Sequence, residues 1–185
     1  MQSTEVYRVE VDVFGHAALS LLVGRAAAPR PELRRVTTLG ALAGGLLPDA
    51  DAVTYLWGLE VFREVHQVYT HNLVALLVLP ALMAALLSSV LEADRRWLYF
   101  AALAGMVGHL IGDVIGLWPV PLFYPFSDVR LAFFLLDQDF SLALDLVLVF
   151  GAASTFLDPI AVSARATRLA FTVTMIAAGF AIALT

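Results

Sequence analysis

Long apolar stretches separated by short polar ones dominate the sequence, and their lengths predict helices that lie in a membrane. The clearest stretch runs from His71 to Leu91, and another runs from Trp97 to Trp118. A helix needs about 20 predominantly apolar residues to cross the hydrocarbon core of a bilayer. Shorter or weaker apolar segments are expected at Val11–Val23, Val36–Leu47, Ala52–Phe62, Phe140–Leu157 and Leu169–Leu184. The pattern predicts an all-α fold, a multi-pass transmembrane helical bundle with about five to six apolar segments.

Some of these segments are too short to span a bilayer. Val11–Val23 is short for a complete span. Pro48 is expected to end the next segment, because proline lacks an amide donor and clashes with the preceding helical turn. Ala52–Phe62 predicts a re-entrant or interfacial helix. We expect one integral-membrane domain over residues 1–185, with its motifs in 11–127 and C-terminal helices in 131–185.

Composition narrows the class of protein. The chain has 185 residues, of which 61% are hydrophobic, and it contains no cysteine. All eleven basic residues are arginine, so a lysine Schiff base and a phosphate loop with a lysine are excluded. The absence of cysteine excludes disulfides, thiolate metal ligands and cysteine nucleophiles. The net charge of -5, without a basic run, argues against a nucleic-acid partner.

The arginines predict an orientation, because loops that retain positive charge tend to stay in the cytoplasm. Alternate linkers hold eight arginines, at positions 25, 30, 34, 35, 95, 96, 165 and 168. The other linkers hold three, at positions 8, 63 and 130. This asymmetry predicts that the N-terminus lies on the outer side of the membrane.

Histidines and aspartates form a candidate site in this apolar chain. Ionisable groups in or near hydrocarbon are costly and usually mark a function. On the predicted topology, all of these groups fall in the outer half of the bundle. The set, taken as candidate metal ligands, is His16, Asp49, Asp51, His66, His71, His109 and Asp113.

The sequence spacing within two pairs of these residues constrains the geometry of the site. His109 and Asp113 are four residues apart, so on a helix they share one face. Asp49 and Asp51 are two residues apart, after Pro48. On an extended segment they would point the same way, whereas on a helix they would diverge.

The remaining histidines are placed in the same outer region. We expect His66 in a linker and His71 at the start of a helix, with Thr70 as its N-cap. Nitrogen and oxygen ligands without sulfur suit a divalent metal, with zinc as the first expectation and manganese or iron as alternatives. The set is larger than one tetrahedral zinc requires, so the site could hold one ion or two bridged by a carboxylate.

Five short motifs follow one another along the chain: Gly-His at 15–16, Leu-Leu-Pro-Asp-Ala-Asp at 46–51, His-Gln-Val-Tyr-Thr-His at 66–71, His-Leu-Ile-Gly-Asp at 109–113 and Tyr-Pro-Phe-Ser at 124–127. In this order they resemble the YdjM-type membrane-bound metal-dependent hydrolases. The resemblance implies a multi-pass inner-membrane protein with distant likeness to zinc-dependent phospholipase C proteins, and it implies the same seven ligands. Gln67, Asn72 and Gly116 depart from the residues usual in that family.

The leading functional hypothesis is hydrolysis, by metal-activated water, of a phosphoester in a lipid or lipid-linked substrate at the outer membrane interface. Asp49 or Asp51 would serve as the catalytic base, and Arg63 and Arg130 would offset charge on the phosphoryl oxygens. The expected partners are the lipid bilayer and this substrate, and the oligomeric state is left open.

Two alternatives use the same residues. A divalent-cation transporter or channel needs polar groups that continue to the cytoplasmic side, whereas the inner halves of the segments are almost wholly apolar. A non-catalytic membrane protein could use the metal to brace its bundle. A metal whose coordination positions are all filled by protein ligands would favour that alternative. A metal with one coordination position open to water would favour catalysis.

Overall fold

Apolar segments of helical length become helices throughout the described part of the chain. The computed structural model describes residues 13–115, 119–133, 145, 147–149 and 151–153. In these residues there is no strand, only an isolated antiparallel bridge between Val120 and Leu131. The all-α expectation is therefore confirmed. The elements are α1 (Val13–Ala26), η1 (Pro31–Leu33), α2 (Arg34–Leu46), η2 (Pro48–Trp57), α3 (Leu59–Val65), α4 (Leu73–Leu91) and α5 (Arg95–Ile115), where η denotes a 3-10 helix.

Two of the described helices, α4 and α5, are long and apolar enough to cross a membrane. They are 19 and 21 residues long, and the most apolar 18-residue stretch of each has a mean hydropathy of 2.5 and 1.6, respectively. At 1.5 Å per residue they reach about 28 and 31 Å, which matches the hydrocarbon core. With 14 and 13 residues, α1 and α2 are shorter than a span. The expectation of five to six such segments is therefore too high for the described residues, and Phe140–Leu157 and Leu169–Leu184 lie largely or wholly outside them.

Local signals explain where the helices begin and end. The Asn72 side chain accepts a hydrogen bond from Ala75 N–H at 2.9 Å and caps the start of α4. At its other end, α4 stops at Glu92, whose φ of 50° is left-handed. Pro48 ends α2, as expected, and begins η2. The Asp94 carboxylate accepts from Arg96 N–H at 2.8 Å, which satisfies a free donor at the start of α5.

The segment between α2 and α4 differs from the single short helix expected at Ala52–Phe62. It consists of η2 and α3, separated at Gly58, whose φ of 113° is readily adopted only by glycine. Asp49 and Asp51 therefore lie on a 3-10 helix, not on an extended segment, and their side chains diverge. Thr70 is not the N-cap of α4, because Asn72 takes that position.

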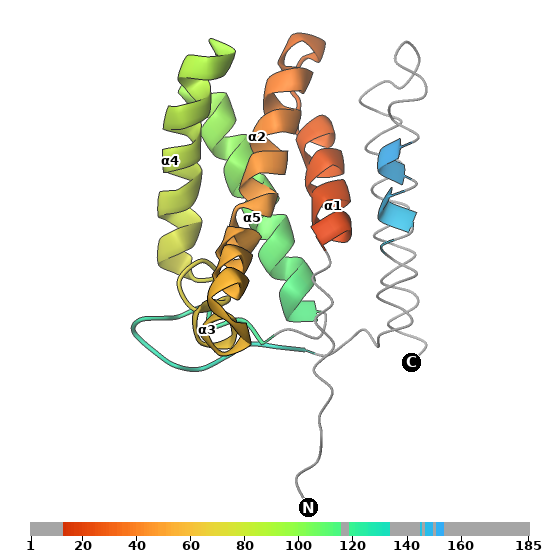
Figure 1. The fold of residues 1–185 in the computed structure, drawn as a ribbon. Helices are drawn as coiled ribbons and strands as arrows, with labels where there is room; N and C mark the ends of the chain where they lie inside the picture. The colour runs from red at the N-terminus through yellow and green to blue at the C-terminus, as the bar shows by residue number, and fades with distance from the viewer. Residues whose placement is uncertain (1–12, 116–118, 134–144, 146, 150, 154–185) are drawn as a thin grey trace, which may run out of the picture.

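The helices α1, α2, α4 and α5 run side by side, with α3 and the 119–133 segment at one end (Figure 1). Small residues bring α2 close to α5. A Cβ atom added to Gly44 would collide with the carbonyl of Ala102, and one added to Gly105 would collide with that of Ala41. Such close approach of backbones is typical of helices that pack within membranes.

Candidate metal centre

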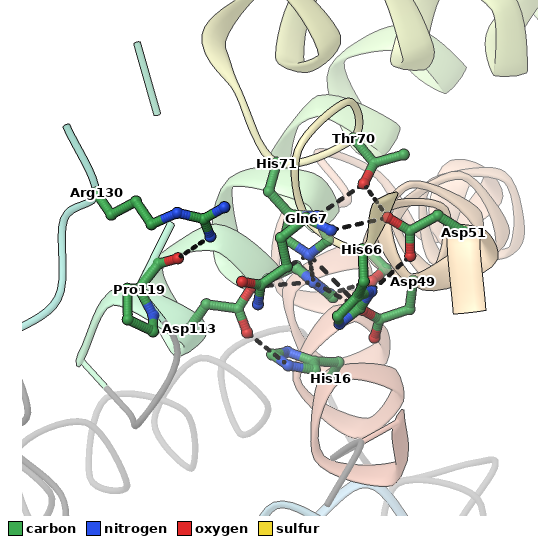
Figure 2. A network of polar contacts seen from close by, with 12 residues as sticks. His16, Asp49, Asp51, His66, Gln67, Thr70, His71, Asp113, Pro119 and Arg130 are labelled. Atoms are coloured by element: carbon green, nitrogen blue, oxygen red, sulfur yellow. Dashed lines mark hydrogen bonds and ion pairs between the residues drawn. The ribbon is translucent and has the colours of Figure 1, made fainter. Parts of the chain in front are cut away.

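Four helix ends and the linker between α3 and α4 meet at the α3 end of the bundle and bring the sequence-predicted cluster together. His16 lies near the start of α1 and Asp49 just after α2, while His71 precedes α4. His109 and Asp113 come from one face of the last part of α5, as their spacing predicts. Figure 2 shows the labelled side chains of this group turned toward one another. Side chains far apart in the sequence therefore form one buried polar site.

The backbone of α2 orients His109. Its Nδ1 lies 2.7 Å from the carbonyl oxygen of Gly45. Because a carbonyl can only accept, Nδ1 carries the proton and Nε2 keeps its lone pair. Gly45 is in the last turn of α2, where carbonyl groups have no partner within the helix. The end of α2 thus selects the tautomer in which Nε2 of His109 can bind a metal.

A relay of hydrogen bonds orients His71 in the same way. Thr70 Oγ1 donates to Asp51 Oδ2 at 2.8 Å. Its single proton is then committed, so it accepts from His71 Nδ1–H, also at 2.8 Å. This leaves the lone pair of His71 on Nε2. Burial lowers the pKa of His71 below its ordinary value, although Asp49 and Asp113 oppose that effect, and this shift favours the neutral imidazole.

Both lone pairs point at the same place. Nε2 of His71 and Nε2 of His109 are 3.0 Å apart, and neither side chain is exposed to solvent. Asp113 Oδ2 lies 3.3 Å from each nitrogen. This buried oxygen has no hydrogen-bond partner in the described residues. Two lone pairs and a carboxylate oxygen repel one another unless a cation lies between them, so the geometry fits a bound metal ion.

Asp49 supplies a further oxygen. Its Oδ1 lies 3.7 Å from His71 Nε2 and 3.6 Å from His109 Nε2. A regular tetrahedron with metal–ligand bonds of about 2.0–2.1 Å has edges of about 3.3–3.4 Å. The five measured edges, from 3.0 to 3.7 Å, bracket this value. His71, His109 and Asp113 could therefore hold a zinc-sized ion, and Asp49, whose Oδ1 is close to both imidazoles, is the candidate fourth ligand.

His16 completes the group from a second side. Its Nε2 lies 3.2 Å from Asp113 Oδ1, the oxygen that faces away from the two other histidines. Its ring stacks on that of His109, with centroids 3.9 Å apart. Ligand atoms of His16, Asp49 and His109 also lie close enough together for a metal. Because His109 has one free lone pair, it cannot serve both groups at once.

Asp51 and His66 form a separate pair beside the four candidate ligands. Asp51 Oδ1 lies 2.7 Å from His66 Nδ1, and Gln67 N–H donates to Asp51 Oδ2 at 3.0 Å. Burial raises the pKa of Asp51, but the hydrogen bonds from His66 and Thr70 outweigh it and hold that pKa below its ordinary value. Both oxygens of Asp51 are thus occupied, and His66 falls in neither group that could hold a metal.

The two arginines expected to bind substrate lie on exposed surface. Arg63 is in α3. Arg130 Nη1 donates to the Pro119 carbonyl at 3.3 Å (Figure 2). The segment that carries Arg130 is attached to α5, because Phe133 N–H donates to the Val114 carbonyl, next to Asp113, at 2.7 Å.

Sequence reasoning missed three residues that position the ligands. Gly45 lies inside a predicted apolar segment, Thr70 has the sequence signal of a helix cap, and Gln67 stands out only as a departure from the family. Gln67 is buried and has a φ of 68°, a left-handed conformation that turns its N–H toward Asp51. The break at Pro48 could have indicated Gly45, because it predicts unpaired carbonyl groups in the preceding turn.

The fold and this site define a class: a helical membrane protein with a buried histidine–aspartate cluster that could hold a metal ion. A family model narrows the class further. The YdjM inner membrane protein model matches residues 11–185, so the chain belongs to that family. The family and the two long apolar helices place the protein in a membrane. No curated protein and no solved structure matches the chain significantly.

Proposed function

We propose that this protein is a membrane-embedded, metal-dependent hydrolase that cleaves a phosphoester of a lipid or lipid-linked substrate. One observation carries the proposal: two buried imidazole lone pairs, fixed by Gly45 and Thr70, converge on an Asp113 oxygen that has no hydrogen-bond partner among the described residues. Zinc is the ion that best fits this donor set, and manganese or iron would use the same ligands. A second ion would need His16 and the outer oxygen of Asp113, which lie 3.2 Å apart.

When bound, the ion would act as a Lewis acid. It would lower the pKa of a coordinated water molecule to about 7 and offset negative charge on a phosphoryl oxygen of the substrate. His71 and His109 are fully buried and hold the ion from the interior. Asp49 is the most exposed of the four candidate ligands, with 11% of its side chain accessible. Water and substrate are therefore expected on its side, and its second oxygen is our candidate for the catalytic base. Asp51, with both oxygens occupied, is the weaker candidate.

A lipid substrate is supported by the depth of the cluster. His71 lies two residues before α4, and Asp113 lies two residues before the end of α5. Because α4 and α5 match the thickness of the hydrocarbon core, their ends lie at headgroup depth. Exposed aromatic residues surround this end, including Trp57 at 68% and Phe126 at 86% exposure. Tryptophan and tyrosine are typical of the membrane interface, and phenylalanine adds apolar contact there.

The distribution of arginines supports an outer location for the site. Six arginines lie at the end of the bundle remote from the cluster, at positions 25, 30, 34, 35, 95 and 96. Arg63 and Arg130 lie at the cluster end, where we propose that they contact the phosphoryl group of the substrate. The preference of positive charge for the cytoplasm assigns the six-arginine end to that side.

Packing beneath the cluster favours hydrolysis over transport of a divalent cation. Between the cluster and the opposite end, α2 and α5 touch through Gly44 and Gly105. Leu98 and Met106 are fully buried in the same region. A cation path needs polar groups along its whole length. Buried polar side chains in the described interior, such as Ser20 and Thr37, donate to carbonyl groups of their own helices. The described residues therefore do not line up as a continuous polar path for a cation.

Metal content and hydrolysis test the proposal together. Protein would be purified in mild detergent without chelator as wild type, His109→Ala and His66→Ala, and its metal would be measured by mass spectrometry. We expect about one zinc equivalent in wild type, retention of metal in His66→Ala and loss in His109→Ala. His66→Ala is the matched control, because it removes a histidine of the cluster that is not a proposed ligand.

The same samples would then be tested for cleavage of phospholipid and lipid-linked phosphoesters. Phosphoester cleavage by wild type that disappears in His109→Ala would support the hydrolase. Absence of metal from wild type, or equal metal in His109→Ala and wild type, would overturn the site. Metal without hydrolysis across these substrates would favour a structural ion.

A further inference from the structure

A groove lies between α4 and α5, toward the end of the bundle remote from the metal centre. Its volume is about 610 Å³. Three alanines of α4, at positions 81, 84 and 85, form one wall, and Tyr99 and Phe100 of α5 line the other. The alanines make room where larger residues would close the space between the helices. The groove lies between α4 and α5, the two described helices that are long and apolar enough to cross a bilayer.

One end of the groove carries two positive charges. Arg95 and Arg96 line it at the first turn of α5. The Arg95 guanidinium is held toward α4, because its Nε donates to Ser88 Oγ at 3.0 Å. The carboxylate of Asp94 accepts from the backbone N–H of Arg96 and so caps the helix. Both arginines therefore line the end of the groove, next to the last residues of its apolar wall.

Neither of the two nearby acids, Glu92 and Asp94, lines this groove. Glu92 lines a neighbouring cavity of about 250 Å³ together with Arg35. The groove thus combines an apolar wall with an arginine pair at one end. Arginine is suited to phosphate, because its planar donors bind phosphate oxygens in pairs.

We infer that this groove binds one anionic phospholipid of the leaflet at the arginine-rich end. The phosphate lies against Arg95 and Arg96, and the upper part of an acyl chain lies over the alanines. From Ser88 to Ala81 the helix advances about 10 Å at 1.5 Å per residue, which accommodates the glycerol and the first acyl carbons. A free phosphate would use the arginines without the apolar wall. The groove is separate from the metal centre and does not depend on the proposed hydrolysis.

Native mass spectrometry of the full chain, released from detergent, tests this site. The probes are phosphatidylglycerol and phosphatidylcholine with the same acyl chains, with glycerol 3-phosphate as the soluble headgroup. We expect one phosphatidylglycerol to bind in preference to phosphatidylcholine, and no binding of glycerol 3-phosphate. In Arg95→Gln/Arg96→Gln, phosphatidylglycerol should bind roughly tenfold to thirtyfold more weakly, because each basic residue near an anionic lipid contributes about fivefold.

Matched variants separate the groove from general effects. Arg30→Gln/Arg34→Gln removes the same charge at the same end, outside the groove, and should leave binding unchanged. Ala85→Phe should fill the groove and displace the lipid, whereas Leu86→Phe, on exposed surface beside it, should not. Equal binding of the two lipids, or equal loss in both arginine pairs, would overturn the inference. A dimer that Ala85→Phe dissociates would also overturn it, because a second copy would then occupy the groove.

Discussion

Substitution of Asp51 by asparagine tests whether this residue positions the ligands or binds the metal itself. Asp51 accepts from Thr70 Oγ1 at 2.8 Å and from Gln67 N–H at 3.0 Å, and it lies 2.7 Å from His66 Nδ1. Asparagine keeps one acceptor oxygen and replaces the other with a donor, so the contacts lose the carboxylate charge, and the contact with His66 Nδ1 survives only if His66 changes tautomer. A hydrogen bond to a charged group contributes about 1.5–3 kcal/mol, and the loss should destabilise the folded protein by an amount of this order.

The effect on metal follows from the relay through Thr70. When Thr70 no longer donates to a carboxylate, its hydroxyl can turn toward His71 and weaken the preference for the tautomer with a free Nε2. Loss of such an outer hydrogen bond reduces metal affinity about 10–100-fold without changing the number of ions bound. Asp113→Asn, in contrast, should remove the metal, because it changes a proposed ligand.

Zinc affinity would be measured by competition with a chromogenic chelator for wild type, Asp51→Asn, Asp113→Asn and Thr54→Val. Thr54→Val is the matched control, since Thr54 Oγ1 donates to the backbone carbonyl of Asp51 at 2.7 Å and does not contact the carboxylate. Complete loss of metal in Asp51→Asn would refute the positioning role and make Asp51 a ligand. Unchanged affinity would refute the relay.

Further predictions concern the helix contacts and the substrate. Gly44→Ala should lower stability by about 3 kcal/mol through overpacking against α5, measured as a reduced midpoint of thermal unfolding in detergent. Gly108→Ala is its control, because an added Cβ there makes only an ordinary contact at 3.7 Å, and equal effects would contradict the packing argument. Gly112→Ala should displace His16, since the new Cβ would lie 3.1 Å from the His16 ring, and weaken any second metal ion while the first stays bound. An unchanged two-ion occupancy would refute this role of His16. Arg130→Gln should raise the KM for a phosphoester about tenfold with unchanged metal content, and an unchanged KM would remove this residue from the substrate site.

Most helices, and which residues belong to the cluster, could be predicted from the sequence. Their apolar lengths and the break at Pro48 are local properties, so the predicted and observed limits of α4 and α5 agree within a few residues. The histidines and aspartates stand out because ionisable groups are costly in an apolar chain. The four-residue spacing of His109 and Asp113 also places them on one helix face, where the structure finds them 3.3 Å apart.

The local conformation between α2 and α4 could not be predicted. Alternation of Asp49 and Asp51 was compatible with an extended segment as well as a helix, and the choice depends on how Pro48 begins η2. Once η2 is a 3-10 helix, Asp49 faces His71 and His109, whereas Asp51 contacts His66. Two aspartates with one predicted role therefore have different positions.

The sequence alone determined that this is an all-helical, apolar chain with a polar cluster, because hydrophobic length and charge are local. Tertiary structure alone decided which atoms of that cluster converge. His109 is oriented by a carbonyl 64 residues earlier in the chain, and His71 by a threonine held on Asp51. The tautomer of each imidazole depends on these partners, and Gly45 reaches His109 because glycines let α2 pack closely on α5.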